Sequence, residues 1–300
     1  MQKEIRNMKH EEEQQSKKEA AISYYSKEQI ECPVCGAKFK REEMYSGGGR
    51  VIAGDLTEEL RRLYEPSAKY GEVYPLIYSM TVCPQCLYAG FTQDFRVIER
   101  PIAERLLEAM NGRYSAVKDL FGHVDFKNAR TLHEGAASYY LALLCYDHFD
   151  SKYSPTIKQA ICALRSAWLF STLGEKEPEE NYTYISKLFY QKALFLYRYA
   201  LELESTGKEM IAGLKSFGPD VDKNYGYDGV IYLGALLEYR YGQTQEAATR
   251  LKRLEMHKIA LAKMFGLGKS SKNKPGPILE YARTLYDTLK RELNETDDDD

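Results

Sequence analysis

The sequence has no apolar run long enough to cross a membrane, since a spanning helix needs roughly 20 consecutive apolar residues. Residues Met1 to Ser23 are charged throughout and lack an apolar core, so we do not expect this segment to be a secretory signal peptide. Basic side chains number 42 and acidic ones 44, and the formal net charge is -2. This balance argues against a protein that binds nucleic acid over its whole surface. We therefore expect a cytoplasmic protein that does not bind membranes.

Histidine is also scarce, and no two histidines have the helical spacing of metal ligands. His148 lies on an apolar stripe, which is typical of a histidine in the core or at its boundary. Three further histidines lie far apart and flank no recognisable acidic pair: His123, His133 and His257. The sequence thus nominates no catalytic base, and it favours a binding protein over an enzyme.

Two further signals for catalysis are weak. Gly268-Lys269-Ser270 resembles the end of a phosphate-binding loop, but Lys263 stands where that pattern needs glycine, and no apolar strand precedes it. Cys145 and Cys162 fall on predicted helix faces among small and apolar residues, so we expect buried thiols rather than nucleophiles.

The remaining four cysteines form two matched pairs, Cys32-Pro33-Val34-Cys35 and Cys83-Pro84-Gln85-Cys86. Two residues inside each pair let both sulfurs of a tight turn converge on one metal ion, and two such turns complete a tetrahedral shell. Gly36 suits the first turn because glycine tolerates a positive φ. Four sulfur ligands leave no position for water or substrate, so the predicted zinc is structural.

The long segment between the pairs, residues 36–82, does not exclude a shared site, because the cost of loop closure rises only logarithmically with length. Two alternatives stay open. The same sulfurs could bind a single iron ion. The pairs could also be separate redox dithiols, although one zinc ion explains both pairs at once. Disulfides fit poorly with the expected reducing compartment.

The segments Cys32–Cys35, Tyr74–Tyr78 and Val82–Phe91 together resemble a bacterial family of unknown function. Its members combine a zinc-ribbon module built on cysteine pairs with tetratricopeptide-like helices. The family usually has glycine directly after the second pair, whereas Leu87 stands there in this chain. The resemblance implies the fold, the metal and a bacterial cytosolic protein, but no activity.

From about residue 99 the apolar residues repeat at helical spacing. Breakers such as Gly218-Pro219 and Pro275-Gly276-Pro277 separate the stripes, which indicates antiparallel helices without intervening strands. The stripes lie at residues 137–148, 157–168, 185–200, 230–241, 247–261 and 278–289. The segment from Gly242 to Ala247 resembles the second half of a tetratricopeptide unit, but no strict 34-residue repeat recurs.

Tyrosine is abundant, with 25 residues, and most of these rings are expected to pack in the core. The functional alternative is a concave groove that binds a peptide or a partner helix. The candidate groove residues are Tyr139, Tyr190, Tyr197, Tyr232 and Tyr239.

We therefore predict a mixed fold with a small β-rich, zinc-ribbon-like module and a mainly α, tetratricopeptide-like domain. The expected parts are a charged extension (1–28), the zinc module with its insertion (29–98), the helical domain (99–293) and an acidic tail (294–300). Residues 57–64 could form a short helix with Thr57 as N-cap. The expected function is a protein-interaction adaptor with structural zinc. The alternatives are a redox-responsive zinc thiolate and an RNA or other anionic partner at the basic residues 250–274.

Overall fold

The computed structural model describes residues 21–45, 47–211, 214, 218–243, 246–265 and 276–297. Most of the predicted charged extension, the last three residues of the acidic tail and the Gly268-Lys269-Ser270 motif lie outside these residues. In the described part the fold is mixed, with mainly helices and small antiparallel sheets, as the sequence predicts.

Each sheet is a single hairpin of two antiparallel strands. The pairs are β1 (Ser23–Glu31) with β2 (Lys38–Met44), β3 (Ile52–Leu56) with β4 (Arg62–Glu65), and β5 (Met80–Val82) with β6 (Ala89–Phe91). The cysteine pairs occupy the turns of the first and third hairpins, and the second hairpin belongs to the segment between them. β1 begins at Ser23, so the strand crosses the expected boundary at residue 28.

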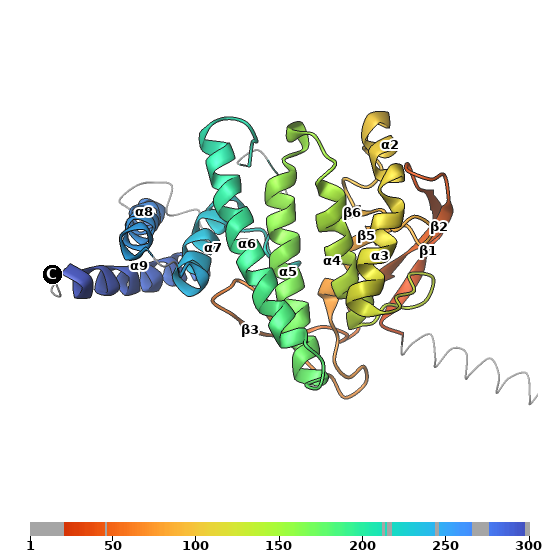
Figure 1. Ribbon diagram of the computed structural model, residues 1–300. Helices are drawn as coiled ribbons and strands as arrows, with labels where there is room; N and C mark the ends of the chain where they lie inside the picture. Colours follow the sequence, from red (N-terminus) through yellow and green to blue (C-terminus); the bar gives the residue numbers. More distant parts are fainter. Residues whose placement is uncertain are drawn as a thin grey trace, which may run out of the picture.

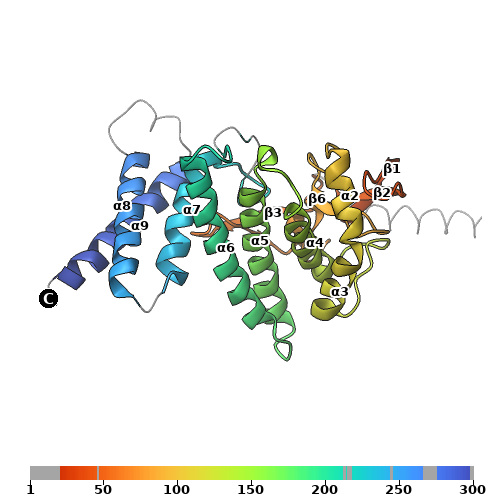
Figure 2. The ribbon, with the colours of Figure 1, turned by 45° about the horizontal axis from the view of Figure 1, so that its top comes forward.

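The helices follow in chain order, and each packs against the next. They are α2 (Arg100–Glu108), α3 (Met110–Phe121), α4 (Leu132–Tyr146), α5 (Pro155–Lys176), α6 (Tyr182–Ser205), α7 (Gly226–Tyr241), α8 (Ala247–Phe265) and α9 (Gly276–Asp297). Figures 1 and 2 show them in a row, with β1, β2 and β6 at the α2 end and α9 at the other end. The predicted helical stripes therefore correspond to α4 through α9.

The starts of α4 and α5 show how local and distant residues share the capping of helices. Thr131 and Glu134 form a capping box at α4. α5 begins at Pro155 as predicted, but Ser154 is left-handed, with φ 47°, and makes no capping bond. Glu209 replaces it and accepts hydrogen bonds from the Thr156 amide (3.1 Å) and hydroxyl (2.8 Å). A residue beyond α6 thus stabilises the start of α5.

Buried polar contacts fix the β5–β6 hairpin to the helices. The Tyr146 hydroxyl in α4 accepts from the Phe91 amide (3.0 Å) and donates to Asp94 (2.7 Å). Lys158 in α5 lies 2.8 Å from the same carboxylate. Because a buried charge that loses its partner is strongly destabilising, these contacts hold one arrangement of hairpin and helix. The apolar core continues across both parts.

The predicted helix over residues 57–64 is wrong. Residues 57–61 form the turn of the second hairpin, in which the Thr57 amide donates to the Arg61 carbonyl (2.9 Å), and β4 follows. Leu60 has a φ of 58°, which no right-handed helix accommodates. Glu58 and Glu59, which suggested a first helical turn, contact distant helices instead.

Within the described part of the chain, no helix has both the length and the apolar character that crossing a bilayer requires.

Candidate metal centre

The sulfurs of Cys32, Cys35, Cys83 and Cys86 converge at one point, and all lie within 4.8 Å of one another. The Cys32 and Cys86 sulfurs are 3.7 Å apart, and those of Cys35 and Cys83 are 3.6 Å apart. Zinc–sulfur bonds of about 2.3 Å in a tetrahedron place neighbouring sulfurs about 3.8 Å apart. The cluster therefore has the size and the donor set to hold a metal ion.

The first turn (residues 32–37) and the second turn (residues 83–88) have the same backbone hydrogen bonds. In the first, the Gly36 amide donates to the Cys32 carbonyl and the Cys32 amide to Ala37, each at 2.9 Å. In the second, Leu87 donates to Cys83 (3.0 Å) and Cys83 to Tyr88 (2.8 Å). Both turns need a left-handed residue after the second cysteine, with φ 73° at Gly36 and 55° at Leu87. The leucine that departs from the family pattern therefore does not change the turn.

Helix α3 covers the second turn through two consecutive residues. Arg113 is only 2% exposed, and its guanidinium donates to the Cys86 carbonyl from Nε (3.3 Å) and Nη2 (2.9 Å). The Tyr114 hydroxyl donates to the Gln85 carbonyl (2.5 Å). No sequence pattern indicated Arg113, because its acceptor is a backbone carbonyl 27 positions away.

The Arg113 guanidinium is a buried cation that forms no ion pair with any residue in the described ranges, and its Nη1 atom has no hydrogen-bond partner there. An isolated buried charge is costly unless an opposite charge lies nearby. Four thiolates around one divalent ion carry a net charge of about -2, which would compensate the guanidinium. This observation supports a metal–thiolate centre beside the second turn.

The thiol pKa values differ sharply within the cluster. The pKa of Cys83 is lowered to about 2, because Cys32 and Cys86 direct hydrogen bonds to its sulfur. The pKa of Cys32 is raised to about 12, mainly by its hydrogen bond with Cys83. Cys83 and Cys32 therefore differ in how readily their thiols lose a proton. A metal ion that binds all four must displace the remaining protons, so its affinity depends on pH.

The other two cysteines are buried, as predicted, and lie outside this cluster. Cys145 accepts a hydrogen bond from the Ala89 amide (3.4 Å), and burial raises its pKa to about 11. Burial also raises the pKa of Cys162. Both thiols are protonated near neutral pH and pack in the core.

The five candidate groove tyrosines do not form an open groove. Tyr139, Tyr197 and Tyr232 are buried, and Tyr190 and Tyr239 are partly buried. The Tyr139 hydroxyl donates to the Leu76 carbonyl (2.8 Å), and this side chain is buried in the core. The Tyr190 and Tyr232 hydroxyls donate to Glu59 and Glu58 of the β3–β4 hairpin, each at 2.8 Å.

In the described part of the basic segment, residues 250–265, three of the five basic side chains lie close to acids. Arg250 pairs with Glu292 (2.7 Å) and Lys258 with Glu255 (2.7 Å). Arg253 lies 3.8 Å from Glu238. These pairs reduce the positive potential that an anionic partner would encounter on α8.

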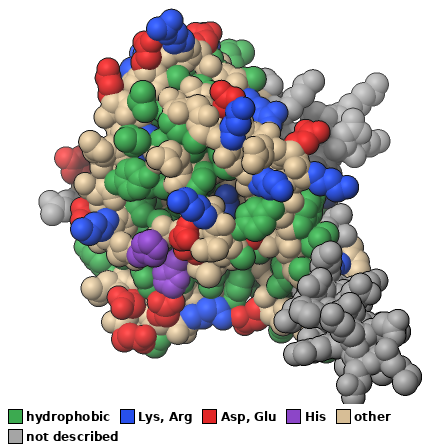
Figure 3. All heavy atoms as spheres, turned by 90° about the vertical axis from the view of Figure 1, so that its right-hand side faces the viewer, with side chains coloured by type: hydrophobic (Ala, Val, Ile, Leu, Met, Phe, Trp, Pro, Cys, Tyr) green, Lys and Arg blue, Asp and Glu red, His purple; other side chains and the backbone are tan. Residues whose placement is uncertain are grey.

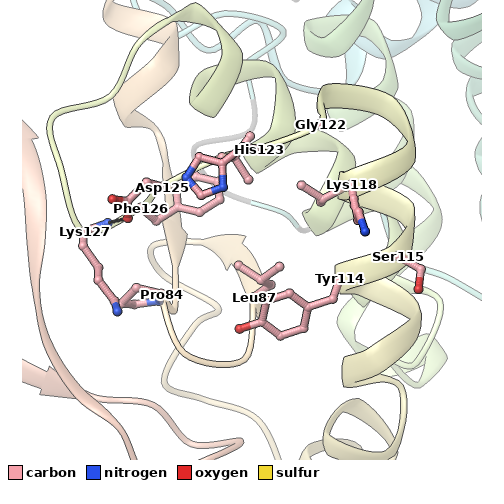
Figure 4. Close-up of a pocket in the computed structure, with 12 residues that line it drawn as sticks. Pro84, Leu87, Tyr114, Ser115, Lys118, Gly122, His123, Asp125, Phe126 and Lys127 are labelled. Atoms are coloured by element: carbon pink, nitrogen blue, oxygen red, sulfur yellow. Dashed lines mark hydrogen bonds between the residues drawn. The ribbon is translucent and has the colours of Figure 1, made fainter.

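A hollow of about 590 Å³ lies between the second turn, α3 and the loop that follows α3. Figure 4 shows Pro84 and Leu87 at its base, Tyr114 and Lys118 along α3, and His123 to Lys127 on the loop. Figure 3 shows the face at the right of Figure 1, where hydrophobic side chains lie among basic and acidic ones. This mixed surface has no large field of one sign.

Comparison with known proteins places the chain in a family. A relative from Borreliella burgdorferi, described as an uncharacterized protein, is 44% identical over 273 residues, which cover 91% of this chain and 98% of the relative. No solved structure gives a significant match. The model of a family described as an uncharacterized protein conserved in bacteria matches residues 25–289, which include both cysteine pairs and most of the helices. The chain therefore belongs to this bacterial family, DUF2225.

Proposed function

We propose that this chain is a cytoplasmic adaptor in which structural zinc holds a zinc-ribbon-like module against tetratricopeptide-like helices that bind a partner protein. The observation that carries the proposal is the four-sulfur cluster beside the buried guanidinium of Arg113, which forms no ion pair with the residues that the structure describes. Four sulfur ligands leave zinc no open position, which favours a structural role over catalysis.

The zinc-ribbon-like assignment rests on the two cysteine pairs, each of which lies in the turn that connects the strands of a β-hairpin. The tetratricopeptide-like assignment rests on antiparallel helices that pack in chain order. At Gly234 an added Cβ would lie 3.2 Å from Leu201, so this small residue lets α7 approach α6 closely. Such close helix pairs are typical of helical repeats.

The proposed partner surface is the outer face of α6 and the hollow beside it. Four large apolar side chains on α6 are between 42% and 62% exposed, at spacings that place them on one helix face: Tyr184, Leu188, Phe195 and Tyr199. A hollow of about 600 Å³ between α3 and α6 continues this surface, lined by Leu120 and Leu188 among others. A contiguous exposed apolar surface of this kind marks an interaction site, and its shape suits the apolar side of a partner helix.

Elemental analysis of the purified protein tests the metal. We expect about one zinc per chain, and its loss in Cys83→Ser, because three sulfurs no longer close the shell. Cys162→Ser, which alters a buried thiol outside the cluster, should retain the zinc. Iron in place of zinc, or wild-type protein without metal, would refute the structural-zinc proposal.

Affinity capture from a bacterial lysate tests the adaptor role. A partner recovered in stoichiometric amount by the wild type should be lost by Leu188→Ser/Phe195→Ser. The control is Met256→Ser, because Met256 is an apolar residue on α8 that is more exposed than either Leu188 or Phe195. Recovery that is the same with all three proteins would exclude the outer face of α6 as the partner surface.

A redox-responsive function is the second candidate, and the unequal burial of the ligands favours it. Cys35 is partly exposed, whereas the other three ligands are buried. Oxidation would then begin at Cys35 and weaken the zinc site. If peroxide releases no zinc, this candidate is excluded. RNA binding is the weakest alternative, because three of the five basic side chains in residues 250–265 lie close to acids.

A further inference from the structure

The hollow between α3 and the second turn is closed on its third side by the loop that follows α3. Gly122 is left-handed, with φ 69°, and its amide closes the last turn of α3, so the chain can reverse there. The loop is then tied to two other elements. The Asp125 amide donates to the Glu134 carboxylate (3.2 Å) at the start of α4, and the Lys127 carbonyl accepts from the Tyr25 hydroxyl (3.2 Å) of β1. The hollow is therefore preformed.

The inner wall of this hollow is apolar. Leu87 from the second turn and Val117 from α3 are buried, and Val124 and Phe126 from the loop are partly buried. The volume of about 590 Å³ lies within the range of small-molecule sites, about 300–1,000 Å³. An aromatic or branched aliphatic group would thus leave water and gain apolar contacts here.

The rim of the hollow is basic. Lys118 comes from α3, and His123 and Lys127 come from the loop. Among the residues that the structure describes, none of these three forms an ion pair with a carboxylate. Asp125 belongs to the same lining, but its oxygens accept from the Lys127 amide and from the Asn128 side-chain amide, each at 2.8 Å. The two lysine charges at the rim therefore lack a balancing acid.

The rim and the second turn face each other across the hollow. Figure 4 shows Lys118 and His123 on the side opposite Pro84 and Leu87. Both cysteines of the second turn are buried, so the turn presents these apolar side chains to the hollow. An anionic group beside Lys118 is thus separated from the negatively charged sulfur cluster by the apolar side of the turn, which limits their repulsion.

We propose that this hollow binds a small organic anion. Its carboxylate, sulfonate or phosphate group lies between Lys118 and Lys127, and its apolar body packs on Leu87 and Phe126. A few polar groups that converge on an apolar hollow are typical of small-molecule sites. The lining contains no residue of α6, so this site is distinct from the surface proposed for a protein partner.

The test titrates the full chain with two fluorescent probes that share one ring system. Anilinonaphthalene sulfonate carries a negative charge, whereas N-phenylnaphthylamine is neutral. Lys118→Gln/Lys127→Gln should weaken binding of the sulfonate about ten-fold, in line with the loss of two partly exposed charge pairs. The neutral probe should change by less than about two-fold. Both lysines are exposed, so the variant should unfold at the same temperature as the wild type.

Two further variants locate the probes. Phe126→Ala should weaken both probes about five-fold, because it removes apolar contact from the wall. Lys187→Gln/Lys192→Gln is the matched control, since it removes the same charge from exposed lysines beside the outer face of α6, and it should leave both affinities unchanged. The proposal is overturned if the sulfonate does not bind, if both lysine pairs weaken it equally, or if Phe126→Ala has no effect.

Discussion

The two cysteine turns share one backbone geometry but are held by different means. The first turn uses Gly36, whose missing Cβ has open space around it, and it leaves Cys35 partly exposed. The second turn places a buried leucine, Leu87, at the same left-handed position, and α3 covers it through Arg113. Local hydrogen bonds are thus sufficient to shape a turn around a glycine. A leucine in that conformation needs the support of surrounding packing, which offsets its backbone strain.

The largest effect is expected from removing the contact that α3 makes with the second turn. Arg113→Ala removes both hydrogen bonds to the Cys86 carbonyl and the cation beside the proposed zinc thiolate. We expect zinc affinity to fall about 10- to 100-fold, as is typical when an outer-shell partner of a metal ligand is lost. Competition with a chromophoric chelator measures the change.

Tyr114→Phe is the matched control for this prediction, since the neighbouring residue makes one hydrogen bond to the same turn and its side chain is exposed. Its loss of affinity should stay below about ten-fold, which corresponds to a single net hydrogen bond. Equal losses for both variants would mean that the guanidinium charge has no special role.

Leu87→Gly tests whether the burial of the leucine side chain or the strain of its backbone has the larger effect on the stability of the second turn. Glycine relieves about 1–2 kcal/mol of left-handed strain. It also removes a buried side chain, and losing a buried leucine side chain costs about 2–5 kcal/mol. We expect the free energy of unfolding to fall by about 2 kcal/mol, measured by urea denaturation of the metal-loaded protein. A variant as stable as the wild type would show that strain and burial balance.

Gly36→Ala gives the smallest change and tests the first turn. The new Cβ would meet no atom within 4 Å, so only the positive φ opposes it, at about 1 kcal/mol. Gly112→Ala in α3 is the control, because it also has open space but no positive φ. Since alanine is the better helix former, this variant should be more stable by up to about 1 kcal/mol. A Gly36→Ala variant that unfolds like the wild type would show that the first turn tolerates side chains as the second does.

Regular patterns made most of the fold predictable. Apolar residues at helical spacing identified α4 through α9, and Pro155 correctly marked the start of α5. The matched spacing of the cysteines indicated that the four sulfurs meet, and they do so across the long insertion. These signals are short-range, since each depends on residues that lie within a few positions of one another.

The predictions that were wrong or incomplete concern residues whose structure depends on long-range contacts. Glu58 and Glu59 suggested the start of a helix, but Arg240 and other side chains of the helical half bind them in a hairpin turn. The tyrosines predicted an open groove, whereas Tyr190 and Tyr232 already hold that turn. Arg113 escaped notice because nothing near it in sequence shows that it is buried.

The sequence by itself determined where the helices from α4 to α9 lie and which four cysteines form the cluster. Helical period and turn geometry are local properties of the chain. Only the tertiary structure decided that α3 covers the second turn and that the turn of the β3–β4 hairpin packs against α5, α6 and α7. Those outcomes depend on burial and charge pairing between residues up to 182 positions apart, as for Arg240 and Glu58. No local pattern encodes such partners, because each side chain alone is compatible with many others.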